Sequence, residues 1–194
     1  RVGTVTGGDS RALQGGIPTD YEVVYQQGDL VRYSVPCLYA DEDDSKGAPS
    51  SVTASAGGGD AASHSFSLSI DGATVSKLQS ATLSFGSLYR FERGPGPTPV
   101  AAVLANPVTT LDAEAIYGGP GRLELAYGGA VPSPQDRLDG VTAAVDITVD
   151  GTTVSTYTLP SVKPNSYEWA SLLEPDDDTT DPVTFLASGG VSVE

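Results

Sequence analysis

Hydrophobic residues recur at every second position in two parts of the chain, and each part ends at a turn signal. Residues 65–70 read Ser-Phe-Ser-Leu-Ser-Ile and are followed at once by Asp71-Gly72. Residues 141–149 place a hydrophobic side chain at every second position before Asp150-Gly151. A period of two is typical of a strand with one buried face. Because the Asp-Gly turn uses positive φ, both stretches are predicted to open β-hairpins.

Weaker alternation elsewhere predicts further short strands and one or two short helices. Residues 122–127 lie between Pro120 and Gly128, the expected helix boundaries. Residues 165–173 begin with Asn165 and carry Glu168 three positions later, which is typical of a helix start. The remaining predicted strands are residues 21–25, 30–38, 80–85, 109–117, 152–159, 183–187 and 191–194. This pattern predicts a mainly β fold, an antiparallel two-sheet sandwich or barrel.

The domain organisation follows from length and local composition. A chain of 194 residues suits about one domain. Residues 1–20 are Gly-rich and predict an extended N-terminal arm that becomes ordered only against a partner surface. Residues 21–194 are predicted to form a single β-sandwich domain. Within it, the polar residues 41–63 predict a long loop, and loops of this length are usually functional or disordered.

The balance of charged residues indicates the solvent conditions in which the protein works. Twenty-five Asp and Glu residues face ten Lys and Arg residues, for a formal net charge of −15. Such self-repulsion weakens a compact state in dilute buffer, but at about 1 M salt the Debye length falls to roughly 3 Å. The composition therefore favours a protein that works in brine, with an ordinary acidic extracellular domain as the alternative. Tight binding of nucleic acid is excluded as a main function, because phosphate affinity requires Lys and Arg.

Other features exclude further classes. No apolar run approaches the roughly 18 residues needed to cross a bilayer, so no membrane span is expected. No signal peptide opens the chain, and the absence of methionine predicts residues lost upstream of Arg1. The single Cys37 cannot form an intrachain disulfide, and its apolar neighbours predict a small buried hydrophobe.

Candidate chemistry is scarce, and we predict that the protein is not an enzyme and has no catalytic residues and no cofactor. His64 is the only histidine, and the chain lacks a Gly-x-Ser-x-Gly elbow, so His64 is interpreted as exposed or capping. Residues 118–121 lack the Lys-Ser/Thr of a phosphate loop, and Trp169 is interpreted as a core anchor. Oxygen ligands could bind a cation weakly at two acidic runs, which contain Asp41, Asp43, Asp44, Asp176, Asp177 and Asp178. A specific metal site is not predicted.

Residues 66–129 resemble the major tail tube proteins of long-tailed, siphovirus-like viruses. The resemblance rests on Ile70-Asp71-Gly72-Ala73-Thr74-Val75, followed by the strands at residues 80–85 and 109–117 and the helix at 122–127. The acidic composition fits a virus of a haloarchaeon. The resemblance implies a two-sheet β-sandwich, of which six copies close a ring and the rings stack into a hollow tube.

The same resemblance implies the function, partners and location. The protein would be a structural virion protein of the tail, a conduit for genome delivery assembled in the host cytoplasm. Its partners would be its own copies, the tail proteins at the tube ends, the tape-measure protein, and DNA that passes without tight binding. Ring closure would pair open sheet edges, which otherwise promote aggregation. Carboxylates on the lumen wall would repel phosphate, a hypothesis that a lumen lined by Arg and Lys would overturn.

Three alternatives stay open. A cell-surface or adhesin-like β-sandwich from a halophile, acting as a binding module, explains the composition and strands equally well. Another virion component, such as a head decoration or tail-terminator protein, also fits. A hydrolase with a pair of acids is the third, because carboxylate pairs meet in space and spacing does not exclude them.

Overall fold

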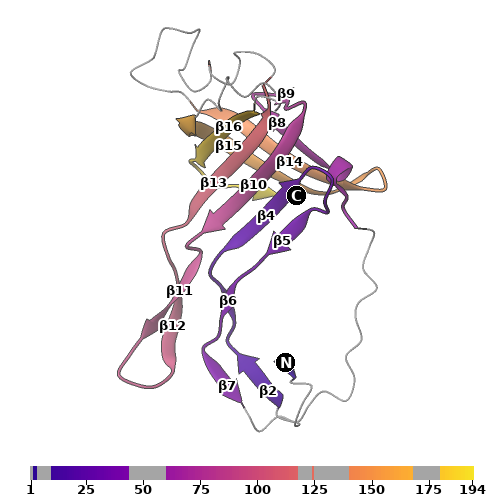
Figure 1. Ribbon diagram of the computed structural model, residues 1–194. Coiled ribbons are helices and arrows are strands. Elements are labelled where there is room, and N and C mark those ends of the chain that lie inside the picture. Colours follow the sequence, from indigo (N-terminus) through magenta and orange to yellow (C-terminus); the bar gives the residue numbers. More distant parts are fainter. Residues whose placement is uncertain (1, 4–9, 44–59, 118–123, 125–139, 168–179) are drawn as a thin grey trace. The chain divides into compact units, whose positions relative to one another are not determined.

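The alternating segments of the sequence form antiparallel β-strands in the computed structural model of the protein (Figure 1). The structure describes residues 2–3, 10–43, 60–117, 124, 140–167 and 180–194. The chain forms two compact units. The first unit comprises Arg1–Tyr21, Ser34–Gly58 and Phe85–Pro107, and the second comprises Glu22–Tyr33, Gly59–Ser84 and Val108–Glu194. The mainly β, antiparallel fold class predicted from the sequence is confirmed.

The second unit is built on one large sheet. Its strands follow the order β5-β4-β10-β13-β16-β15-β14-β8-β9, and β17 pairs with β15 beside this path. The bounds are β4 Tyr21–Gln26, β5 Arg32–Ser34, β8 Phe66–Ile70, β9 Ala73–Thr74, β10 Leu78–Gly86, β13 Val108–Ile116, β14 Val141–Val149, β15 Thr152–Tyr167, β16 Thr180–Ala187 and β17 Ser192–Val193. A 3-10 turn, η1 (Ser63–Ser65), precedes β8.

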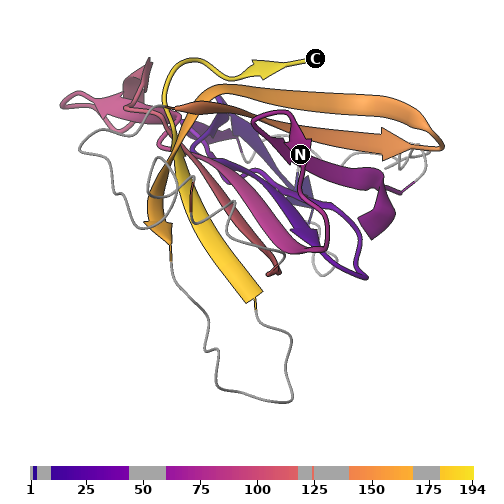
Figure 2. The ribbon, with the colours of Figure 1, turned by 90° about the horizontal axis from the view of Figure 1, so that it is seen from above.

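The long strand β15 folds this sheet into two layers. Its first part pairs with β14, and its last part pairs with β16. Val162 stands at the change, because it lies opposite Val141 of β14 and also opposite Ala187 of β16. Figure 2 shows β14 and the first part of β15 forming one layer, with β10, β13 and β16 crossing below it. One continuous sheet thus becomes a sandwich.

The core of the second unit comes from the alternation seen in the sequence. Alternate residues are buried in the middle of β13 and β14, and in β16 at Asp181, Val183 and Phe185. The largest fully buried hydrophobic side chains are Phe185, Leu68, Leu83, Leu111, Ile147, Leu159, Val23, Val145 and Val162. Burying each such side chain stabilises the fold by about 1.5–3 kcal/mol. Both layers contribute to one core, which fixes the opposite face of each strand toward the exterior.

Backbone contacts also bring the two ends of the strand order together. The N–H of Val31, just before β5, donates to the carbonyl of Ala61 at 2.8 Å. Leu30 and Ala62 form an isolated antiparallel bridge at the same place. Because β5 begins the strand order and the segment at 61–62 leads through η1 into β8, these contacts curl the sheet toward a closed barrel.

The first unit is made of short ribbons. β1 (Val2–Gly3), β2 (Ser10–Gln14) and β7 (Asp41–Asp43) form a three-stranded sheet. β3 (Ile17–Pro18) pairs with β6 (Cys37–Leu38), and β11 (Tyr89–Arg93) pairs with β12 (Pro99–Leu104). The N–H of Leu88 donates to the carbonyl of Thr19 at 2.8 Å, which connects the β3–β6 and β11–β12 ribbons.

Both predicted hairpin turns are confirmed. Asp71 and Gly72 have φ of 52° and 73°, and Asp150 and Gly151 have φ of 50° and 76°. Two successive positive φ angles match the right-handed twist of the flanking strands, which is why Asp-Gly is favoured there. β14 keeps the predicted bounds, and the predicted strands at 21–25, 80–85 and 109–117 correspond to β4, β10 and β13.

Several expectations need correction. The helix expected from Asn165 is wrong at its start, because residues 165–167 continue β15 and Tyr167 lies opposite Val183 of β16. The ladder with β16 outweighs the local capping pattern there. Residues 168–173 lie outside the described residues, and so do the other residues of the helix predicted around Glu124, which is itself helical. The thiol of Cys37 is exposed rather than buried, because β3 and β6 form only a two-stranded ribbon.

The expected arm and loop contain regular structure where they are described. Residues 1–20 include β1, β2 and β3, and the expected loop at 41–63 begins with β7, which pairs with β2. The expected strand at 30–38 is divided into the bridge at Leu30, β5 and β6. Short pairings of this kind leave no long alternating run, so the sequence pattern alone did not reveal them.

Candidate assembly surfaces

The outward face of β10, β13 and β16 is a polar surface of the second unit. Leu111, Ala113 and Ala115 of β13 point into the core, so Asp112 and Glu114 point outward between them. Alternation in β10 directs Ser80 and Thr82 to the same side. These residues surround a shallow hollow of about 180 Å³, lined also by Pro182 and Thr184 of β16.

Hydroxyl groups of the neighbouring strands contact both carboxylates of this face, one at short and one at long distance. The hydroxyl of Thr184 donates to Asp112 Oδ1 at 2.5 Å, across the β13–β16 ladder where the two residues are opposite each other. The hydroxyl of Ser80 on β10 donates to Glu114 Oε2 at 3.5 Å. All four side chains are half-buried. Contacts from β16 and β10 on either side thus direct Asp112 and Glu114 along the outward face.

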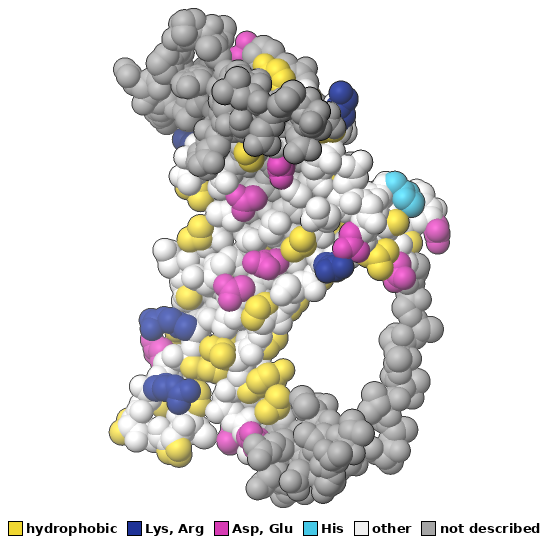
Figure 3. Space-filling view, in the orientation of Figure 1, with side chains coloured by type: hydrophobic (Ala, Val, Ile, Leu, Met, Phe, Trp, Pro, Cys, Tyr) yellow, Lys and Arg dark blue, Asp and Glu magenta, His cyan; other side chains and the backbone are white. Residues whose placement is uncertain are grey.

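The electrostatics of this face are one-sided. β4, β10, β13 and β16 contain no Lys or Arg, whereas β4 adds Glu22 to the acids of β13. Figure 3 shows acidic side chains distributed over these strands. Like charges on a polar sheet repel phosphate and attract cations. The face is therefore suited to exclude nucleic acid from close contact.

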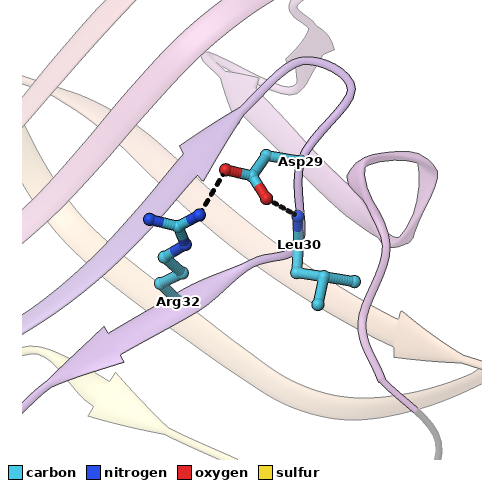
Figure 4. Close-up of polar contacts among 3 residues, drawn as sticks. All are labelled: Asp29, Leu30 and Arg32. Atoms are coloured by element: carbon cyan, nitrogen blue, oxygen red, sulfur yellow. Dashed lines mark hydrogen bonds and ion pairs between the residues drawn. The ribbon is translucent and has the colours of Figure 1, made fainter.

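The loop between β4 and β5 presents a second, differently built surface. Asp29 Oδ1 accepts from the backbone N–H of Leu30 at 2.8 Å, and Asp29 Oδ2 pairs with an Arg32 guanidinium nitrogen at 2.6 Å (Figure 4). The hydrogen bond from Leu30 is the main cause that holds the pKa of Asp29 below its ordinary value, and Arg32 adds to it. These bonds fix the loop that carries the bridge to Ala62, next to β5 at one end of the strand order.

The residues singled out from the sequence are not brought together. Asp41 is exposed on β7, where its Oδ1 accepts from the N–H of Glu42 at 2.8 Å, and Asp43 lies on the same strand. Asp44, Asp176, Asp177 and Asp178 lie outside the described residues, as do Trp169 and residues 118–121. Within the described part of the chain, no three His, Cys, Asp or Glu side chains are grouped as metal ligands. His64 is exposed in η1.

Sequence reasoning missed Asp112 and Glu114. The signal that could have found them is the same alternation that placed Leu111, Ala113 and Ala115 on one face, since the residues between must occupy the other. It also missed β11 and β12, which flank the loop expected at residues 94–97. In the residues that the structure covers, no helix has the length and hydrophobicity to cross a membrane.

Comparison with known proteins gives a likeness of fold. No protein-family model matches the chain, and no curated protein matches it in sequence. Among solved structures, the cap that terminates the tube of the anti-feeding prophage is similar, with a TM-score of 0.52 and 12% identity over 67% of this chain and 87% of that one.

Two chains from an extracellular contractile injection system, PVC, are also similar at 12% identity. A chain of its sheath–tube complex gives a TM-score of 0.50 over 66% of this chain and 87% of the other. A chain of its sheath/tube terminator gives 0.52 over 66% and 92%. All three structures were determined by electron cryomicroscopy. At this identity the likeness establishes the fold, a β-sandwich of the kind found in these particles.

Proposed function

We propose that this protein is a structural component of a viral tail or a related injection particle, and that its copies form rings that stack into a tube. The observation that carries the proposal is the fold, which is shared over two thirds of the chain with components of tube-containing particles. The function is geometric and electrostatic, without a catalytic step. The tape-measure protein and passing DNA would occupy the lumen.

The margins of the large sheet support association between copies. β5 stands at one end of the strand order, and although Leu30 and Val31 just before it contact Ala62 and Ala61, the three residues of β5 itself are all exposed. An exposed sheet edge is a template for pairing with another chain, and closure into a ring protects it. A contact that repeats by rotation closes a ring of identical copies. Six copies per ring is the number that we propose.

The acidic outward face of β10, β13 and β16 is proposed to line the bore. Asp112 is held there by the hydroxyl of Thr184, Glu114 lies beside Ser80, and β4, β10, β13 and β16 contain no Lys or Arg. Repeated around a ring, these carboxylates would repel the phosphates of DNA and let it pass without being gripped. The net charge of −15 further supports work at high salt, as expected for a virus of a haloarchaeon.

A tube terminator is a second candidate, favoured by the names of two of the similar structures. These are a tube-terminating cap and a sheath/tube terminator. A terminator would form a single ring that closes one end of a tube made by another protein. Stacking would therefore stop after one ring of a terminator, whereas rings of a tube protein would continue to stack.

Electron microscopy of the purified protein in concentrated salt tests both candidates. Tubes of many stacked rings are expected for the tube protein, and isolated rings are expected for the terminator. Single particles at all protein and salt concentrations would contradict both, and would favour a monomeric binding module. Images of the same sample after dilution into low salt serve as the control for charge repulsion.

A further inference from the structure

One face of the β11–β12 hairpin of the first unit is entirely hydrophobic, whereas its other face, called the polar face below, also carries charged side chains. Its register pairs Tyr89 with Leu104 and Phe91 with Ala102, so these four side chains share one face. The register pairs Arg90 with Val103 and Glu92 with Ala101 on the other face. There Arg90 and Glu92 approach each other to 3.8 Å. An aromatic and aliphatic face on a two-stranded ribbon needs a partner to cover it.

The hydrophobic face is not covered within the described structure. Leu104 is 61% exposed and Tyr89 is 41% exposed. Val100, next to the irregularity in the pairing, is 70% exposed. A two-stranded hairpin alone is marginally stable in water, and it gains stability when its hydrophobic face is packed. Exposed hydrophobic side chains gathered in one place mark interaction sites.

The charge of the hairpin indicates which partner fits. Residues 89–104 contain Arg90, Arg93 and Glu92, which give this segment a net charge of +1, so the remaining residues of the chain carry −16. Figure 3 shows basic and hydrophobic side chains side by side in the region of β11 and β12. A segment that is hydrophobic and basic is complementary to a strongly acidic surface, and every other copy of this chain presents one.

We propose that the hydrophobic face of the β11–β12 hairpin docks onto a second copy of this chain, with Leu104 at the contact. The inference rests on the proposed function in one respect, namely that copies associate. It adds the element that makes the contact. The other face of the hairpin, where Arg90 and Glu92 pair, stays at the edge of the contact. The attraction to the acidic neighbour comes from the net charge of +1 on residues 89–104.

Two variants that add the same charge on opposite faces test the proposal. Leu104→Asp places a carboxylate on the hydrophobic face, and Ala101→Asp places one on the polar face of the same strand. Assembly is measured by sedimentation velocity in concentrated salt, with circular dichroism to confirm that both variants fold. We expect Leu104→Asp to raise the concentration needed for assembly at least about tenfold, and Ala101→Asp to change it less than about twofold. Equal effects of the two variants would overturn the proposal.

Cross-linking identifies the occupant directly, even if Leu104→Asp fails to fold. In a Cys37→Ser background, Leu104→Cys and, as control, Ala101→Cys are labelled with a photoactivatable maleimide. Chains of natural isotope composition are mixed with ¹⁵N-labelled chains, assembled and irradiated. Mixed-isotope cross-links that are at least about tenfold more abundant from position 104 are expected. Cross-links only within one chain, or none in a sample whose images show rings or tubes, would overturn the docking proposal and leave the proposed function standing. A sample that remains monomeric would overturn both.

Discussion

The ring of Tyr25 on β4 stacks on the ring of Phe66 on β8, with centroids 4.6 Å apart and planes 16° from parallel. These strands are second from opposite ends of the strand order. The stacked pair therefore lies where the curled sheet meets itself, beside the bridge between Leu30 and Ala62. Packing, rather than a continuous ladder, holds the two layers together at this seam, which is the side of the sandwich opposite the bend in β15.

Phe66→Ala is expected to destabilise the second unit strongly. The substitution removes a buried ring and leaves a cavity beside Tyr25, which costs about 3–5 kcal/mol for a Phe in a core. The measurement is denaturant unfolding followed by circular dichroism. Tyr89→Ala, at an exposed ring of the first unit, is the control and should change the free energy of unfolding by less than about 1 kcal/mol. Similar losses for the two variants would show that the seam does not carry the stability assigned to it.

The stability of wild-type protein is expected to fall at alkaline pH through Tyr25. Burial raises the pKa of Tyr25, and its hydroxyl donates to the carbonyl of Leu78 at 3.3 Å. A pKa that is higher in the folded state stabilises the protein below the unfolded value of about 10, and this contribution is lost as pH rises through the folded pKa. Tyr25→Phe should lose about 0.5–1.5 kcal/mol at neutral pH and respond less to alkali. Unfolding measured between about pH 8 and 11 checks this; parallel curves for the two proteins would contradict it.

Asp29 is expected to make stability fall at acid pH, whereas Tyr25 makes it fall at alkaline pH. Its pKa is lowered in the folded state, mainly by the N–H of Leu30 and further by Arg32. The contribution to stability is therefore present above the unfolded pKa of about 4 and is lost as pH falls through the folded value. Asp29→Asn keeps an oxygen for Leu30 but removes the charge that pairs with Arg32. The difference in melting temperature between wild type and Asp29→Asn should narrow below about pH 4, and a difference that is constant with pH would contradict this.

The sequence predicted the parts of the fold that have a long period-two pattern. β14 alternates over its whole length and ends at Asp150-Gly151, so both its bounds and its buried face followed from the residues. The bend at Val162 was not predictable, because it depends on which strand pairs with β15 beyond its pairing with β14. For the same reason Asn165 read as a helix start, since its partner strand β16 lies further along the chain.

The candidate surfaces were harder to predict from the sequence than the fold. Asp112 and Glu114 follow from alternation in β13, but their orientation depends on Thr184 and Ser80, which are distant in sequence. The β11–β12 hairpin was hidden because a Gly- and Pro-rich loop separates two strands with little alternation. Long-range pairing, which no local pattern encodes, placed these residues.

Salt is expected to stabilise the protein markedly. With a net charge of −15, repulsion among carboxylates opposes the compact state, and added salt screens it. The melting temperature should rise as NaCl increases from about 0.05 M to 1 M, where the Debye length falls to roughly 3 Å. Sucrose at matched osmolarity is the control, because it stabilises by exclusion without screening charge. An equal rise in sucrose, or no rise in NaCl, would count against electrostatic repulsion as the factor that limits stability.

The acids of the outward face are expected to keep DNA from binding to the assembled protein. Asp112→Lys with Glu114→Lys reverses two charges per copy on a face whose strands contain no Lys or Arg. Phosphate affinity grows with each added cation and weakens steeply with salt. Assemblies of the double variant should therefore retain short duplex DNA in a filter-binding assay at about 0.1 M salt, where wild-type assemblies should not. Asp41→Lys with Glu42→Lys, on β7, is the matched control for total charge. Equal retention by the two variants would mean that net charge, and not the outward face of the sheet, decides contact with DNA.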